Sequence, residues 1–145
     1  MTITLKRLVP GDEAVLGNVA EGVFDEPVRP DLVVRFLATE NYRIVVALDG
    51  DLVVGMATGF THFHPDKDED FFVNEVGVAD SYLRRGIATR LMAAILAEAK
   101  AMGCREAWLG TEHDNGPALG VYRKVMGAGD SEEAMSVFTF DLIRR

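Results

Sequence analysis

The chain has 145 residues, of which 48% are hydrophobic and 26% are charged. This length and composition are typical of one globular domain, so we expect a single domain over residues 1–145. No apolar run approaches the roughly 20 residues that cross a bilayer, and the N-terminus lacks the pattern of a signal peptide. The lone cysteine, Cys104, cannot form an internal disulfide. We therefore expect a cytoplasmic protein without a membrane partner.

The formal net charge of −8 disfavours nucleic acid as a partner, because its recognition normally needs a basic patch. Two interpretations of the charge remain open. An acidic surface can attract a cationic small molecule, or the charge can simply keep the protein soluble.

The first half of the chain alternates between strand and helix patterns. Residues 2–8 predict a strand, and Asp12 can cap a helix that ends before Asp25-Glu26-Pro27. A shorter helix is expected over residues 32–38. Two β-branched runs, residues 42–48 and 52–58, flank Asp49-Gly50 and predict a hairpin.

After the hairpin, residues 62–70 read as a polar loop and residues 71–78 as another strand. Residues 86–102 give the clearest helical periodicity, and residues 107–109 follow as a short strand. A helix over residues 117–124 and a strand over residues 135–142 complete the chain. This order predicts an α/β fold with a mixed sheet of about six strands flanked by four helices.

The strongest functional signal lies where the strand over residues 71–78 leads into the clearest helix. The connecting loop is short and basic and contains glycine: Leu83-Arg84-Arg85-Gly86. Free backbone N–H groups at a helix N-terminus bind anions such as a pyrophosphate. The loop lacks the glycine spacing of a dinucleotide fingerprint and the ending of a Walker loop. A plain strand-to-helix turn with two solvated arginines is the alternative.

Gly77 interrupts an otherwise strong strand. A glycine there indicates a bulge or the close approach of another backbone-like group. An extended pantetheine arm carries amides and could pair with this strand like an additional edge strand.

Two blocks of sequence resemble a known superfamily. Arg84-Arg85-Gly86-Ile87-Ala88, after Glu75-Val76-Gly77-Val78, resembles the acetyl-coenzyme A signature Gln/Arg-x-x-Gly-x-Gly/Ala of the GNAT N-acetyltransferases. The block from Asn115 to Lys124 is similar to their Asn-x-x-Ala-x-x-Leu-Tyr-x-Lys block. Leu83 departs from the first motif, and Met126-Gly127-Ala128 replaces the usual Gly-Phe after the second.

The resemblance implies the GNAT fold and acetyl-coenzyme A as cofactor, with direct transfer to an amine in a ternary complex. The residues that match the coenzyme site are Val76, Val78, Arg84, Arg85, Gly86, Ile87, Ala88, Thr89 and Asn115. The segment Thr111-Glu112-His113-Asp114 and the short C-terminal tail look like those of aminoglycoside 3-N-acetyltransferases of the gentamicin and fortimicin resistance type.

The resemblance also implies roles for three groups at the reacting centre. Glu75 would be the base that accepts the proton of the ammonium, and Tyr122 would donate a proton or hydrogen bond to the leaving thiolate. The backbone N–H of Val76 would stabilise the oxyanion. In the alternative interpretation Glu75 is a strand-face carboxylate paired with a lysine, and Tyr122 packs a helix onto the sheet.

A cationic acceptor needs carboxylates, and three segments could supply them on the face opposite the coenzyme. We expect substrate contacts from Asp25 and Glu26, from Glu112 and Asp114, and electrostatic attraction from the acids of residues 66–70. His62 and His64 beside these acids fit neither a zinc nor a calcium pattern, so no metal is expected.

Several alternatives stay open from the sequence. The acceptor could be an aminoglycoside, a polyamine, a small amine metabolite or a peptide N-terminus. The chain could also be an acyl-coenzyme A-binding module without transferase activity. Because members of the superfamily often pair their sheets, a homodimer is a candidate assembly.

Overall fold

The structure, a computed structural model, describes residues 2–145. Its five strands are β1 (Ile3–Arg7), β2 (Tyr42–Asp49), β3 (Leu52–His64), β4 (Lys67–Val78) and β5 (Ala107–Trp108). They form one sheet in chain order, antiparallel from β1 to β4 and parallel between β4 and β5. The α/β fold with a mixed sheet is therefore confirmed.

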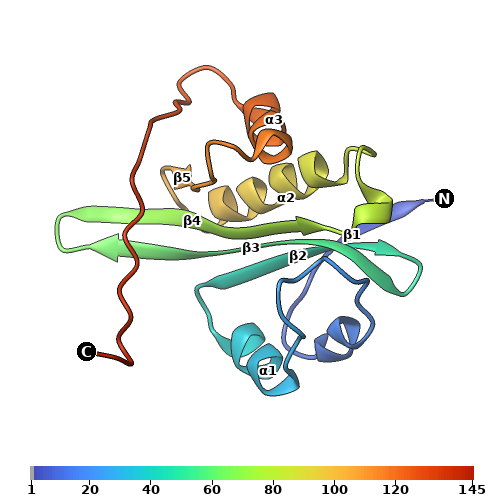
Figure 1. Ribbon diagram of the computed structural model, residues 1–145. Helices are drawn as coiled ribbons and strands as arrows, with labels where there is room; N and C mark the ends of the chain where they lie inside the picture. Colours follow the sequence, from blue (N-terminus) through green and yellow to red (C-terminus); the bar gives the residue numbers. More distant parts are fainter. Residues whose placement is uncertain (1) are drawn as a thin grey trace.

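Helices cover both faces of this sheet (Figure 1). The α-helices are α1 (Pro30–Ala38), α2 (Ile87–Ala101) and α3 (Gly116–Val125), and two 3-10 turns are η1 (Glu13–Gly17) and η2 (Asp80–Tyr82). Helices α2 and α3 lie on one face, while η1 and α1 lie on the other. None of the helices in the described chain has the length and apolarity needed to cross a membrane.

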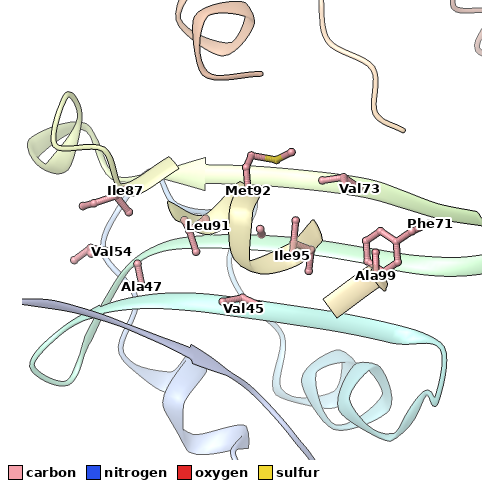
Figure 2. Close-up of a cluster of buried hydrophobic side chains, with 11 residues drawn as sticks. Val45, Ala47, Val54, Phe71, Val73, Ile87, Leu91, Met92, Ile95 and Ala99 are labelled. Carbon is pink, nitrogen blue, oxygen red and sulfur yellow. The ribbon is translucent and has the colours of Figure 1, made fainter. Parts of the chain in front are cut away.

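Helix α2 packs directly on the face of the sheet that α2 and α3 cover. Ile87, Leu91 and Ile95 recur every four residues and are 0–2% exposed, as the periodicity predicts. They pack against strand residues that include Val54 and Phe71 (Figure 2). The start of α2 is therefore held firmly above the sheet, together with the loop that precedes it.

The segment after Asp12 is not the helix that the sequence predicts. It makes only the short turn η1, and then Asn18 and Ala20 bond to β3: the N–H of Val53 donates to Asn18 O (2.9 Å), and the N–H of Ala20 donates to Val53 O (2.9 Å). Glycine disfavours helix continuation at Gly17, and these strand-like bonds replace the helical ones.

The polar loop expected over residues 62–70 is also mostly strand. β3 continues to His64 and β4 begins at Lys67, so a tight turn at residues 65–66 joins two long strands. Aromatic residues at matched positions, such as Phe60 opposite Phe72, explain why pairing extends this far.

The strand expected over residues 135–142 is absent from the described sheet. After α3 the chain runs as an extended segment past the sheet (Figure 1), and its large apolar side chains from Met135 onward are 63% to 96% exposed. A strand needs a neighbouring strand for its N–H and C=O groups, and the sheet ends at β5. The described residues therefore hold five strands and three α-helices rather than about six and four.

Candidate active site

Strands β4 and β5 separate after a very short parallel pairing. Only Phe71 with Ala107 and Phe72 with Trp108 are paired. β4 then continues to Val78, whereas the chain after Trp108 turns away toward α3. One edge of β4 beyond Phe72 thus opens into a gap without a strand partner among residues 2–145.

The backbone groups that face this gap follow from the pairing with β3. The N–H of Ala79 donates to Val54 O at 2.9 Å, so the backbone N–H of Ala79 faces β3. In an antiparallel pair the backbone N–H and C=O groups of the adjacent residue face away from that partner strand. Val78 and Val76, opposite Gly55 and Ala57, therefore direct their N–H and C=O groups into the gap.

A bulge sets this direction. The register between β3 and β4 shifts at Thr58/Gly59, which leaves Asn74 as the additional residue on β4. The N–H of Phe71 faces β5, where it donates to Glu106 O at 2.9 Å. Backbone N–H and C=O groups alternate in direction along a strand. Counted from Phe71 without the additional residue, those of Val76 would face β3 instead of the gap.

The basic loop lies at the end of β4 and opens into α2. Gly86 is the N-cap of α2 with φ +75°, and Arg84 has φ +62°, a left-handed conformation that is uncommon for a residue with a side chain. Gly86 has no side chain with which to cap the first-turn N–H groups. The helix dipole and these N–H groups make the loop an anion site, and Arg84 is exposed beside it.

The other expected coenzyme residues divide into backbone and side-chain roles. Ile87 is 2% exposed in the core, so only its backbone can reach a ligand. Ala88 and Thr89 are half-buried in the first turn of α2. Arg85 donates to Ser81 O (3.1 Å) and lies over the Tyr82 ring (5.0 Å).

Asn115 has a structural task. Its side-chain oxygen accepts a hydrogen bond from the N–H of Ala118 at 3.3 Å and caps α3. This cap fixes the start of α3, which carries Tyr122.

Tyr122 lies on α3 and is half-buried against the hydrophobic core. Burial raises the pKa of its phenol above the usual value. The phenol therefore keeps its proton at neutral pH, which a hydrogen-bond donor to a thiolate requires.

Glu75 lies on the other face of the sheet. Position 77 faces η1 and α1, because a Cβ at Gly77 would lie 2.2 Å from the Val23 carbonyl oxygen, and positions 75 and 77 share one face of a strand. The close approach that the sequence suggests at Gly77 is thus made by Val23. It brings the segment before α1 down onto β4.

This packing changes the electrostatics of Glu75. Although Glu75 reaches solvent, desolvation raises the pKa of its carboxyl, and the negative charge of Asp25 raises it further. A carboxylate with a raised pKa is a better proton acceptor near neutral pH.

A cavity of about 830 Å³ opens between η1 and α1. Its charged lining residues in the described chain are all acidic: Glu13, Glu21, Asp25 and Glu26. Asp25 lines this cavity and its charge acts on Glu75, so it links the acidic cavity to that carboxyl electrostatically.

The other expected substrate carboxylates lie elsewhere. Glu112 and Asp114 are exposed in the connection between β5 and α3, outside the cavity lining of the described chain. Asp66 and Asp70 belong to the β3–β4 hairpin, where Lys67 pairs with Asp66 at 2.7 Å and Arg105 with Asp70 at 3.8 Å. The structure thus gathers the first of the three acidic segments, but not all three, around the cavity.

Three residues, Glu13, Glu21 and Asn74, were not predicted from the sequence to belong to the site. Glu13 and Glu21 fall in the segment that was assigned to a helix, where their convergence on one cavity could not be seen. Asn74 adjoins Glu75, but alternation alone does not reveal which residue of a strand is bulged.

The family of the chain emerges from a comparison of sequences. The model of the acetyltransferase (GNAT) family matches residues 16–128. No curated protein matches the chain.

Solved structures share this fold. An aminoglycoside acetyltransferase from an uncultured soil metagenomic sample superimposes with a TM-score of 0.74 at 19% identity, covering 97% of this chain and 100% of the other. Aminoglycoside N-acetyltransferase AAC(6')-Iy in complex with CoA gives 0.75 at 17% identity, covering 97% and 95%. A ribosomal-protein-alanine N-acetyltransferase from Brucella melitensis gives 0.66 at 14% identity, covering 95% and 100%.

The open edge of β4, the anion-binding start of α2 and the family match over residues 16–128 agree with one another. The chain therefore belongs to the GNAT family and is an acetyl-coenzyme A-dependent N-acetyltransferase.

Proposed function

We propose that the chain transfers the acetyl group of acetyl-coenzyme A to an amino group of an aminoglycoside, at the 3-amino group of the 2-deoxystreptamine ring. The acidic cavity carries the proposal, because an aminoglycoside bears several ammonium groups and each needs an acceptor. The aminoglycoside acetyltransferases among the similar folds add support. The choice of the 3-position rests on sequence resemblance: the segment around Glu112 and the short C-terminal tail look like those of aminoglycoside 3-N-acetyltransferases.

Each group of the reacting centre has one task in this proposal. Glu75 accepts the proton of the substrate ammonium, directly or through a water, and so frees the nitrogen lone pair for attack. The N–H of Val76 donates to the carbonyl oxygen on which negative charge develops. Tyr122 donates to the sulfur as the carbon–sulfur bond breaks.

The residues present fit acetyl-coenzyme A, which supplies the acetyl thioester. The N–H and C=O groups of Val76 and Val78 suit the amides of a pantetheine arm, and the start of α2 suits a pyrophosphate. In this arrangement Arg84 adds charge at the phosphates. Glu112 and Asp114 are proposed to reach the acceptor from the β5 side.

The first prediction concerns the basic loop before α2, residues 83–86, which is proposed to bind the pyrophosphate of coenzyme A. Gly86→Ala should weaken coenzyme A binding at least tenfold, about 1.4 kcal/mol, because a Cβ enters the anion site and opposes the left-handed backbone. Gly103→Ala is the matched control, since Gly103 has φ +86° beyond the other end of α2 and equally open space. Calorimetry should show weaker binding for the first variant only, and equal affinities would refute the loop assignment.

The second prediction concerns pH. Glu75 must be deprotonated to act as a base, so kcat should rise with pH through its raised pKa. Asp25→Asn removes a negative neighbour, which lowers that pKa and should move the acidic limb of the kcat profile to lower pH. Glu26→Gln, from the same cavity, should leave the limb in place.

Glu75→Gln removes the group whose titration the acidic limb of the kcat profile is expected to report. It should lower kcat by ~10²–10⁴-fold and abolish the limb. A Glu75→Gln enzyme that retained both the rate and the limb would exclude Glu75 as the base.

The third prediction concerns the acceptor. Thiol release from acetyl-coenzyme A, measured across aminoglycosides, polyamines and peptides, should be fastest with a 2-deoxystreptamine drug. The Michaelis constant for that drug should rise steeply with salt, because salt screens the attraction between exposed charges over ~10 Å at ordinary ionic strength. NMR of the product should place the acetyl group on the 3-amino nitrogen. Acetylation at the 6'-amino group would refute the position, and turnover of peptides alone would refute the substrate class.

A further inference from the structure

The basic loop before α2, residues 83–86, holds two residues in left-handed conformations. Arg84 has φ +62° and Gly86 has φ +75°, and Arg84 is the one residue with a side chain at positive φ within residues 2–145. Such a conformation costs free energy in a residue that has a Cβ, and it persists where the surrounding structure holds it. Because the whole loop is exposed, its shape needs support from outside the loop.

The backbone bonds of the turn before the loop are short-range. The N–H of Tyr82 donates to Ala79 O at 2.8 Å, and the N–H of Leu83 donates to Asp80 O at 3.3 Å. Each of these bonds joins residues three apart. They curl the chain into η2, but they do not fix the end of η2 to the sheet.

The side chain of Tyr82 makes that connection. Tyr82 is the last residue of η2, and its hydroxyl donates to Asp49 Oδ2 at 2.5 Å, across 33 residues of sequence. Asp49 is the last residue of β2 and is paired with Ile3 of β1 and Leu52 of β3. The acceptor thus belongs to three paired strands, whereas the donor adjoins the basic loop. Both lie at the same end of the sheet (Figure 1).

The surroundings of Tyr82 suit a fixed donor. Its side chain packs against both hydrophobic clusters, one on each face of the sheet. The hydrogen bond to Asp49 is the main cause that raises the pKa of the phenol, so the hydroxyl keeps its proton at neutral pH. The guanidinium carbon of Arg85 lies 5.0 Å from the centre of the same ring. Tyr82 therefore contacts the loop on one side and the sheet on the other.

We propose that Tyr82 and Asp49 are positioning residues for coenzyme A, because their hydrogen bond holds the basic loop in the left-handed shape that presents its N–H groups to the pyrophosphate. The inference rests on the proposal that this loop binds the pyrophosphate. Both residues act through the loop rather than on the reacting atoms. A loop that is already in its binding shape loses less conformational freedom when the ligand arrives, and so it binds more tightly.

Calorimetry with coenzyme A and the full chain tests the proposal. Tyr82→Phe keeps the ring and removes the hydroxyl, and it should weaken coenzyme A binding at least about fivefold, since a hydrogen bond to a charged group is lost. Asp49→Ala should do the same. The double variant should bind no more weakly than either single variant, because both substitutions remove one bond. Tyr42→Phe makes the same chemical change at the other end of β2 and should leave the affinity unchanged.

Asp49→Asn separates the hydrogen bond from the charge. An asparagine keeps an acceptor oxygen, so this variant should recover most of the affinity that Asp49→Ala loses. If Asp49 acted only through its charge, its removal would relieve repulsion of the phosphates, and both substitutions would tighten binding. Without coenzyme A, the amides of residues 83–86 should exchange faster in Tyr82→Phe, while those in the middle of α2 stay as in the wild type.

The outcomes distinguish this inference from the loop assignment on which it rests. Wild-type affinity in Tyr82→Phe, with weak binding by Gly86→Ala, would overturn the positioning role and leave the loop assignment intact. Wild-type affinity in both variants would refute the loop assignment and this inference together. A lower Tm of Tyr82→Phe without a change in affinity, or additive losses in the double variant, would also overturn the positioning role.

Discussion

The site depends on how backbone hydrogen-bonding groups are satisfied along one edge of β4. Buried N–H and C=O groups are almost always paired in folded proteins. β4 and β5 share only two residue pairs before they diverge, so the edge from Val76 to Val78 is left with groups that must bind something other than protein strand. The edge is therefore ready to accept the amides of a ligand, and the positions of the other functional groups follow from it.

Three local features place those groups around the gap. The bulge at Asn74 turns Val76 and Val78 toward the opening. The absence of a side chain at Gly77 lets the Val23 carbonyl approach β4, which brings Asp25 near Glu75 on the face away from α2. On the face that α2 and α3 cover, the packing of Ile87, Leu91 and Ile95 fixes the left-handed loop at Gly86. The loop at Gly86 and the carboxyl of Glu75 thus lie toward opposite faces of the sheet.

Much of this arrangement was predictable because it follows from short-range patterns. The four-residue spacing in α2, the Asp49-Gly50 hairpin and the glycine before α2 were identified from the sequence, and the structure confirms these elements. The loop residues and Glu75 were located correctly on the elements because strand and helix boundaries there are sharply marked.

The rest depended on contacts between distant segments. The segment after Asp12 has apolar residues at helical spacing, yet the backbone groups of Asn18 and Ala20 form hydrogen bonds with Val53 instead. In this conformation Glu13 and Glu21 line the acidic cavity. The segment over residues 135–142 has the alternation of a strand, but whether a strand forms depends on an available neighbour. Asn115 matches a family motif, while its contact with Ala118 shows a capping role that the motif does not disclose.

The proposed mechanism requires that coenzyme A binds along the open edge of β4. Amide exchange of the ¹⁵N-labelled protein, followed residue by residue with and without coenzyme A, tests it most directly. Binding should slow exchange at Val76 and Val78, whose N–H groups face the gap, while Gly77 is protected by β3 in both states. Unchanged exchange at Val76 and Val78 in a protein saturated with coenzyme A would contradict it.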